Sequence, residues 1–256
     1  MEAEQETDAG KKTDAGQETG GGYGVEAGYG ADAGHRNEAE RRSPVAHWPL
    51  YALRLRTPRL ELRVPGLPLL DRLAEVAAAG LHPAGEMPFT VPWSEEADGR
   101  GQRVFQHVLG TIAQWTPQNW SLSLAVLHEG DVVGRQDLTA SDFAVVREAE
   151  TGSWLGLPYQ GRGIGTEMRA AALHLAFEGL GAERMTSAAM TDNARSLAVS
   201  EKLGYAPDGV RTVAVRGERR TLQRLLLTRD RWKRHRTVPV EMAGLEECRE
   251  MFGVSP

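Results

Sequence analysis

The segment YQGRGIGT, residues 159–166, constrains the fold more than any other stretch of the sequence. Gly161, Gly163 and Gly165 lie within five positions, and the thirteen residues that follow Gly165 contain no glycine. A strand candidate precedes these glycines, and helical spacing follows them. Glycine lets the main chain approach a ligand closely, and the first N–H groups of a helix have no intrahelical partners. The segment therefore predicts a phosphate site at a helix N-terminus, although an ordinary glycine-rich turn explains the three glycines equally well.

Two common phosphate-binding motifs do not fit this turn. A P-loop needs Gly-Lys-Ser/Thr at the start of its helix, but the chain has Gly165-Thr166-Glu167, so no lysine reaches a terminal phosphate. A dinucleotide fingerprint counted from Gly161 needs glycine at position 166, which is threonine. The spacing therefore argues against a nucleotide hydrolase and against a dinucleotide-binding site.

Hydrophobic periodicity predicts that helices and strands alternate along the chain. Strands are expected over residues 53–64, in a hairpin over 121–140 that turns at the sequence EGD, from 143 to 157, and over 182–190, 210–215 and 221–228. Helices are expected over 67–82 closed by Gly80, 95–115 with Ser94 as N-cap, 163 to about 180, a segment between the N-cap Asn193 and Gly204, and 244–253. This order of elements predicts an α/β fold.

The first 45 residues have the composition of a disordered, acidic and glycine-rich tail. Residues 1–42 repeat TDAG and contain no Leu, Ile, Phe or Trp, so they offer too little apolar area to offset chain entropy. Tyr23 and Tyr29 are candidate interaction points, but a solubilising extension explains the segment more simply. Residues 46–256 are expected to form a single domain with a C-terminal helical extension, because the chain, 41% hydrophobic, can bury a full core.

Charge, hydropathy and cysteine content limit the classes of protein to which this chain can belong. Residues 1–42 hold ten acids and five Lys/Arg, so they carry the whole formal charge of −5, and the neutral remainder argues against direct nucleic-acid binding. The arginines at 216–224 are more simply a solvated strand face than a site for an acidic partner. No apolar run reaches the roughly 20 residues that span a bilayer, and no secretory signal is evident, so no membrane partner and a cytoplasmic location are expected. The single Cys248 has no Cys or His neighbour, so neither an internal disulfide nor a metal is expected.

Two segments together resemble the GNAT acyltransferase superfamily. Its pyrophosphate loop reads Gln/Arg-x-x-Gly-x-Gly/Ala, which here is Gln160-Gly161-Arg162-Gly163-Ile164-Gly165. The segment TDNARSLAVSEKLGYAPDG, residues 191–209, is similar to the strand end and helix that follow in that family. LRTPRLELR at 55–63 and RLLLTRDRW at 224–232 resemble the RimJ/RimL-like branch, the ribosomal-protein N-acetyltransferases and their relatives. The resemblance covers roughly residues 53–232.

The resemblance implies a GNAT fold, which is an α/β (α+β layered) arrangement. Its mixed, mostly antiparallel central sheet is flanked by helices and splayed where acyl-CoA binds. Pantetheine would bond to main-chain groups of the strand before the glycines, and the pyrophosphate would lie on the amides that follow. The implied cofactor-binding residues are Trp154, Leu155, Leu157, Gln160, Gly161, Arg162, Gly163, Ile164, Gly165, Thr166 and Asn193. A solvent-facing Arg162 and a simple helix-start Thr166 are equally good explanations of those two residues.

Acyl transfer to an amine needs a base, because an alkyl amine with a pKa near 10 is mostly protonated at neutral pH. Glu148 and Glu150 are candidate bases on one face of the strand before the glycines, and Asp137 and Asp142 are further candidates after the hairpin. Glu150 is favoured, although acids at such positions are more often surface groups.

The proton donor for the leaving thiolate departs from the commonest family pattern. Many members of the superfamily use a tyrosine four residues before the helix-ending glycine, and this chain has Ser200 there. RimL-like proteins instead have a serine three residues after the asparagine, which is Ser196 here. The resemblance therefore implies a catalytic Ser196, held by or near Asn193. A first-turn polar residue is the simpler structural explanation of Ser196.

The implied activity is that of an acyl-CoA-dependent N-acyltransferase. It would move an acetyl or other short acyl group from acyl-CoA to a primary amine of a protein N-terminus or a small molecule. Tryptophans at 93, 115, 120 and 154 are candidates to line the acceptor pocket, although core packing is the commoner role of tryptophan. The missing tyrosine keeps a second hypothesis open, a catalytically silent acyl-CoA-binding sensor or assembly module. A homodimer is also left open.

Overall fold

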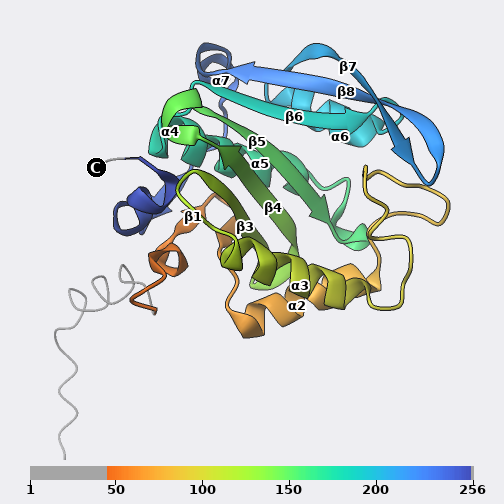
Figure 1. Ribbon diagram of the computed structural model, residues 1–256, viewed down its shortest axis with the longest axis horizontal. Helices are drawn as coiled ribbons and strands as arrows, with labels where there is room; N and C mark the ends of the chain where they lie inside the picture. Colours follow the sequence, from red (N-terminus) through yellow and green to blue (C-terminus); the bar gives the residue numbers. More distant parts are fainter. Residues whose placement is uncertain (1–44, 255–256) are drawn as a thin grey trace, which may run out of the picture.

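The computed structural model describes residues 45–254, so the tail expected over residues 1–45 lies outside the described residues except for Val45. A nine-stranded sheet in the order β7-β8-β6-β5-β4-β3-β2-β1-β9 forms the centre of the molecule (Figure 1). The strands are β1 (Arg54–Arg56), β2 (Leu60–Arg63), β3 (Asn119–His128), β4 (Asp131–Ser141), β5 (Glu148–Leu155), β6 (Arg184–Met190), β7 (Ala206–Val215), β8 (Glu218–Thr228) and β9 (Glu241–Ala243). The helices are α2 (Leu67–Ala79), α3 (Arg100–Ala113), α4 (Phe143–Val146), α5 (Ile164–His174), α6 (Ala194–Lys202) and α7 (Arg229–His235). Shorter helical turns are η1 (Pro49–Ala52), η2 (Leu157–Tyr159), η3 (Leu175–Gly179) and η4 (Glu246–Phe252).

Helices pack on both faces of this sheet (Figure 1). On one face, α2 and α3 pack against the sheet, and Val108 belongs to the same buried cluster as Trp154. On the other face, α5 and α6 pack against the sheet, and Met168 belongs to the same buried cluster as Leu155. Trp154 and Leu155 lie on opposite faces because successive strand residues alternate. We refer to these faces as the α3 face and the α5 face.

Tight turns connect the strands of the β3–β4 and β7–β8 hairpins. Glu129 and Gly130 join β3 to β4 with φ angles of 53° and 86°, and Arg216 and Gly217 join β7 to β8 with φ angles of 52° and 77°. Positive φ at both central residues is the turn geometry that matches the twist of paired strands. The hairpin expected over 121–140 is therefore confirmed, with each strand slightly longer than expected.

The expected strand over 143–157 is interrupted. Residues Phe143–Val146 form the short helix α4 and bury the ring of Phe143, so β5 begins only at Glu148. The strand ends at Leu155, and Leu157 already belongs to η2. The expected helix at 244–253 is present as the 3-10 segment η4, which buries Cys248 and Phe252.

Ser94 is not the N-cap of α3, which begins at Arg100 after a left-handed Gly99. The buried hydroxyl of Ser94 instead lies 2.8 Å from Nε2 of His82. The guanidinium of Arg100 donates to the carbonyl of Ser94 at 2.8 Å, and that of Arg103 donates to the carbonyl of Trp93 at 2.8 Å. Because helix side chains bond these carbonyls, residues 93–99 form an irregular loop rather than another helical turn.

The parallel pairing between β5 and β6 is short. Its register runs only from Glu148↔Arg184 to Glu150↔Thr186. Beyond this point β5 stays paired with β4 as far as Leu155, and β6 stays paired with β8 as far as Met190. The two strands therefore separate beyond Glu150 (Figure 1). This confirms the splayed, mostly antiparallel mixed sheet, and we call the region beyond Glu150 and Thr186 the β5–β6 divergence.

Candidate functional site

The glycine turn leads from β5 into α5 beside the β5–β6 divergence. Gly161 and Gly163 have φ angles of 73° and 79°, and Gly163 is the N-cap of α5. Since L-residues rarely adopt such angles, these two glycines permit the turn. A Cβ on Gly165 would lie 3.7 Å from Leu155 Cδ1 and 3.8 Å from Val199 Cγ2, which are ordinary contacts. The turn therefore directs the free N–H groups of the first turn of α5 towards the place where a phosphate would lie.

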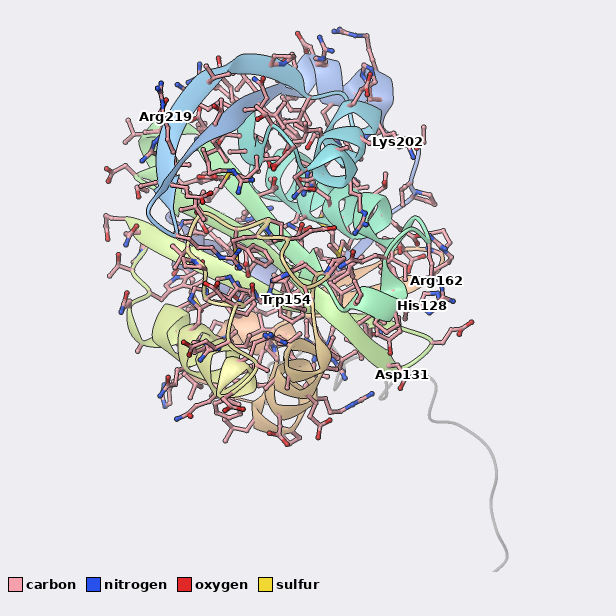
Figure 2. The ribbon with its side chains drawn as sticks, turned by 90° about the vertical axis from the view of Figure 1, so that its right-hand side faces the viewer. His128, Asp131, Trp154, Arg162, Lys202 and Arg219 are labelled. Carbon is pink, nitrogen blue, oxygen red and sulfur yellow. The ribbon has the colours of Figure 1, made fainter. Side chains whose placement is uncertain are left out.

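The remaining residues of the turn differ in exposure. Arg162 is exposed at the surface of the turn, where Figure 2 shows it on the right-hand side. Ile164 is buried in the core under the helix start. Thr166 is half-buried in the first turn of α5. Arg162 and Thr166 are thus the side chains of the turn that remain accessible to a bound anion.

The side chain of Gln160 connects three parts of the site. Its Nε2 donates to the carbonyl of Leu81 at 2.7 Å and to the carbonyl of Leu155 at 3.0 Å. Its Oε1 accepts from Arg195 Nη1 of α6 at 3.1 Å. Gln160 therefore fixes the end of β5 relative to α6, and its side-chain amide is engaged by protein groups.

The main-chain groups on the free edge of β5 alternate in direction. The N–H of Gly156 donates to the carbonyl of Val133 in β4 at 2.9 Å, so Trp154, two residues earlier, also turns its main-chain groups to β4. The groups of Ser153 and Leu155 then turn to the β5–β6 divergence. The N–H of Leu157 donates to the carbonyl of Gly80 at 3.1 Å. Of the three positions expected to bond pantetheine, Leu155 alone directs its N–H towards the divergence.

Arg59 and Glu167 form an ion pair at the turn that the sequence did not reveal. The Glu167 carboxylate accepts from Thr57 Oγ1 at 2.6 Å, from the Arg59 N–H at 3.1 Å and from Arg59 Nε at 2.7 Å. Arg59 Nη2 also lies 2.6 Å from this carboxylate, and Arg59 Nη1 donates to the carbonyl of Arg162 at 3.2 Å. Burial by itself raises the pKa of Glu167, but these hydrogen bonds outweigh burial and leave its pKa below the ordinary value. The pair fixes the start of α5 to the β1–β2 turn.

Helix α6 presents one stripe of residues to α5. Asn193 caps the helix, and its Oδ1 accepts from the N–H of Ser196 at 3.1 Å, which confirms the expected cap. Ser196, Val199 and Ser200 share the stripe because they are three or four residues apart. Ser200 is fully buried, accepts from Arg169 Nη1 at 2.8 Å and donates to the Ser196 carbonyl at 3.1 Å. The half-buried Ser196 therefore has the more accessible hydroxyl of the two serines.

The four candidate bases have different environments. Glu148 pairs with Arg184 at 2.7 Å. Asp137 pairs with Arg135 at 2.8 Å and accepts from Ser123 at 2.8 Å. Asp142 is the residue before α4, with a φ of 50°, at the far end of β4. Glu148 and Asp137 are thus neutralised by arginines, which distinguishes them from the fourth candidate, Glu150.

Glu150 lies at the last paired position of β5 with β6, on the α3 face. Among the described residues, no hydrogen bond or ion pair engages its carboxylate. Its pKa is raised above the ordinary value by desolvation, against the opposing charge of Arg211. A carboxyl group with a raised pKa holds a proton more readily, which suits a base.

The tryptophans divide between the core and the α3 face. Trp115 stacks on Trp120 with ring centroids 5.8 Å apart, and Trp120 contacts Phe252 edge-on at 5.0 Å, so these residues are core groups. Trp93 lies 6.2 Å from Trp154 on the α3 face, close to the β5–β6 divergence. Figure 2 shows Trp154 at the middle of the molecule, between the two helical layers.

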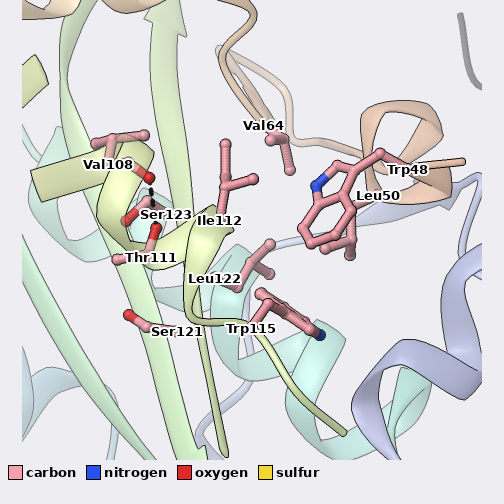
Figure 3. A pocket seen from close by; sticks show the side chains of 10 residues that line it. All are labelled: Trp48, Leu50, Val64, Val108, Thr111, Ile112, Trp115, Ser121, Leu122 and Ser123. Carbon is pink, nitrogen blue, oxygen red and sulfur yellow. Dashed lines mark hydrogen bonds between the residues drawn. The ribbon is translucent and has the colours of Figure 1, made fainter. Parts of the chain in front are cut away.

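One small cavity lies away from this site. A cavity of about 10 Å³ between α3, η1 and β3 has room for roughly one water molecule. It is lined by Trp48, Leu50, Val64, Val108, Thr111, Ile112, Trp115, Ser121, Leu122 and Ser123 (Figure 3). Within residues 45–254, no group of three or more His, Cys, Asp or Glu side chains could hold a metal ion.

The residues present fit a coenzyme A derivative. The helix start at Gly163 supplies N–H groups for a pyrophosphate, and Gly161 has no atom within 4 Å of where its Cβ would lie, so a ligand can approach it. The free edge of β5 beside the divergence supplies main-chain donors and acceptors for the amides of pantetheine.

Comparisons with known proteins identify the family. The sequence model of the acetyltransferase (GNAT) domain matches residues 59–206. A curated relative from Bacillus subtilis (strain 168), named "Putative ribosomal N-acetyltransferase YdaF", is 28% identical over 142 residues, which are 54% of this chain and 73% of the relative. Mycobacterium smegmatis RimJ in complex with CoA-disulfide has a similar fold, with a TM-score of 0.56 at 18% identity over 76% of this chain and 91% of that chain.

A second solved structure has the same architecture. RimL, described as the ribosomal L7/L12 alpha-N-protein acetyltransferase in complex with coenzyme A, has a TM-score of 0.54 at 19% identity over 67% of this chain and 95% of that chain. At such identities the two structures show a shared fold, whereas the family match extends over more than half of the sequence. The chain belongs to the GNAT acetyltransferase family.

Proposed function

We propose that this protein transfers an acetyl or other short acyl group from acyl-CoA to a primary amine. The observation that carries the proposal is the glycine turn that opens α5 directly beside the unpaired edge of β5. The glycine turn suits the pyrophosphate of acyl-CoA, and the unpaired edge of β5 suits its extended pantetheine chain. Acetyl is the proposed acyl group because no residue identified at the site calls for a larger one.

The donor would lie with its pyrophosphate on the N–H groups from Gly161 to Thr166. Arg162 adds positive charge there and Thr166 adds a hydroxyl. The pantetheine would follow the free edge of β5, bonded to main-chain groups of Ser153 and Leu155. Gln160 and Asn193 act as positioning residues in this arrangement. Gln160 holds α6 close to the end of β5 through Arg195, and Asn193 caps the N-terminus of α6.

Glu150 is the proposed base. It lies where β5 and β6 separate, three residues or about 10 Å along β5 from Ser153, at the closed end of the divergence towards which the donor points. Its raised pKa favours uptake of a proton from the attacking ammonium, directly or through water. The main-chain N–H of Leu155, turned to the divergence, is a proposed donor to the acyl oxygen as negative charge develops on it.

Ser196 is the proposed proton donor to the departing sulfur. Its hydroxyl lies on the α6 stripe that faces α5, one turn from the buried Ser200. Ser200 itself is a poor candidate, since its hydroxyl already donates to the Ser196 carbonyl.

The proposed acceptor is a primary amine at a protein N-terminus, with a small-molecule amine as the other possibility. Relatives and structural neighbours are named for ribosomal proteins, which favours the first. The half-buried Phe89 and Trp93 lie beside Trp154 on the α3 face, and their rings offer an apolar surface to the residue that follows the amine.

Mass spectrometry tests the proposal. The purified protein is incubated with acetyl-CoA or succinyl-CoA and with either a panel of peptides with free N-termini or a cell extract, and acylated products are identified. We expect release of coenzyme A together with acylated N-termini. Tight binding of CoA without transfer to any acceptor would instead support the silent acyl-CoA-binding module.

A further inference from the structure

One buried cation has no part in the reaction as described so far. Arg169 on α5 is 5% exposed, and no carboxylate among the described residues forms an ion pair with it. Its Nη1 donates to Ser200 Oγ at 2.8 Å and its Nη2 donates to Ser153 Oγ at 3.2 Å. Its buried Nε has no partner in the part of the chain that the structure describes. Removing a charge from water without a counter-ion is costly, so this guanidinium calls for an anion that residues 45–254 do not supply.

Arg169 belongs to a buried polar cluster on the α5 face of the β5–β6 divergence. The Tyr205 hydroxyl lies 3.2 Å from Thr151 Oγ1, and Ser187 Oγ donates to the Thr151 carbonyl at 3.4 Å. The cluster consists of Thr151, Ser153, Arg169, Ser187, Ser200 and Tyr205. It lies at the narrow end of the divergence, just past the last β5–β6 pair.

The proposed path of the donor leads to this cluster. A strand rises about 3.3 Å per residue, so Ser153 lies about 7 Å and Thr151 about 13 Å along β5 from Leu155. In the proposed arrangement, a donor that starts at the N-terminus of α5 follows this edge and has its thioester between Leu155 and Ser153. The unpaired cation and the sulfur would then lie on the same stretch of strand.

We infer that Arg169 is a positioning residue that stabilises negative charge on the sulfur of coenzyme A. The inference rests on the proposed function. In the transfer, the amine nitrogen bonds to the acyl carbon, the C–S bond breaks and its electron pair goes to sulfur. The amine gives a proton to Glu150 or water, and the sulfur takes one from Ser196 or water. Arg169 acts through its charge and through the hydroxyls of Ser153 and Ser200, in surroundings where a charge is weakly screened.

The groups around Arg169 do not cancel its charge. Tyr205 is the titratable side chain that interacts with it most directly, and burial raises the pKa of this tyrosine, so it stays neutral near pH 7. Glu150 lies on the opposite face of the sheet. Arg169 therefore carries a positive charge among cluster residues that are otherwise neutral near pH 7.

The test is the pKa of the thiol of bound coenzyme A, measured from the ultraviolet absorbance of its thiolate over a pH series at saturating CoA. The protein's own thiol does not ionise in this range, because burial raises the pKa of the single Cys248 to about 12. An opposite charge within about 4–6 Å lowers a pKa by roughly 1–3 units, so we expect the bound thiol to titrate at least about one unit below the usual 8.5. Arg169→Met should abolish this shift, and Arg169→Lys should retain part of it.

Arg229→Met is the matched control. Arg229 is also an arginine held by hydrogen bonds within the protein, since its Nη2 donates to the carbonyl of Ala182 at 2.7 Å, but it lies at the other end of β6. This variant should keep the lowered thiol pKa. With acetyl-CoA, Arg169→Met should lower kcat about tenfold per lost pKa unit and leave the Kd for CoA near that of the wild type.

The outcomes separate the inference from the proposed function. A protein that fails to bind CoA overturns the proposed function. A protein that binds CoA with an unshifted thiol pKa overturns the inference alone, as does a shift that persists in folded Arg169→Met. If Arg169→Met does not fold, the titrations of the wild type and of Arg169→Lys still test the inference. Arg169→Lys retains the positive charge, so loss of the pKa shift in this folded variant would contradict a role of charge.

Discussion

The ion pair between Arg59 and Glu167 should contribute more to stability than any surface pair of this protein. Its carboxylate is 9% exposed and has four donors within 3.1 Å, although Arg59 is 45% exposed. Breaking a buried pair typically costs about 3–5 kcal/mol, and partial exposure of the arginine reduces that figure. We expect Glu167→Gln, which keeps the size of the side chain, to lower the free energy of unfolding by about 2–3 kcal/mol and Tm by about 4–10 °C.

Urea denaturation of the wild type and of Glu167→Gln measures this loss. Glu246→Gln is the control, because Glu246 pairs with Arg249 at 2.9 Å but is 74% exposed, and it should cost less than about 0.5 kcal/mol. Arg59 also bonds the carbonyl of Arg162 in the glycine turn, so Glu167→Gln should weaken CoA binding as well.

The pH dependence gives the sharpest check. The pKa of Glu167 is lowered in the folded state, so its contribution is fully present above the ordinary glutamate pKa and is lost as pH falls through the lowered value. The difference in unfolding free energy between wild type and Glu167→Gln should therefore be constant from pH 6 to 8 and shrink below about pH 4.5. A difference no larger than that of the control, or one that does not shrink in acid, would refute the reasoning.

Three further substitutions test the site. Gly165→Glu should fold, since its Cβ makes ordinary contacts, but calorimetry should show greatly weakened CoA binding because the carboxylate blocks and repels the pyrophosphate. Ser196→Ala should lower kcat about 10²–10⁴-fold with little change in CoA affinity. The control Ser141→Ala, at the exposed end of β4, should leave kcat unchanged. Full turnover of Ser196→Ala under conditions where chemistry is rate-limiting would exclude Ser196 as the acid. Glu150→Gln should lower kcat and remove the acid limb of the pH–rate profile. Because the pKa of Glu150 is raised, this limb should lie at a higher pH than the pKa of an ordinary carboxyl group. An unchanged limb would show that another group is the base.

Features specified by short stretches of sequence were predictable. The glycine turn, the Asn193 cap and the Glu129-Gly130 hairpin each depend on residues within a few positions, because positive φ angles and cap hydrogen bonds are local requirements. The splayed sheet followed only from the family resemblance, since no local signal indicates where two parallel strands stop pairing.

Features that depend on distant residues were not predictable in the same way. Ser94 has the residue type of an N-cap, but Arg100 and Arg103 bond the loop carbonyls and helix α3 begins later. The Arg59–Glu167 pair joins residues 108 positions apart. The direction of main-chain groups on β5 depends on its register with β4, which composition alone does not reveal.

The two faces of the sheet divide the proposed chemistry. Glu150 lies on the same α3 face of β5 as Trp154, whereas Ser196 and Arg169 lie with the helices of the α5 face. In the proposed reaction, the proton would therefore leave the amine on one side of β5, and the departing sulfur would be stabilised on the other side. Such a separation requires a place where the sheet is open, since a fully paired sheet would keep the two groups apart. The short β5–β6 pairing provides such an opening directly after Glu150. In the proposed arrangement, the acyl carbon would lie in this opening, between its proposed base and its proposed acid.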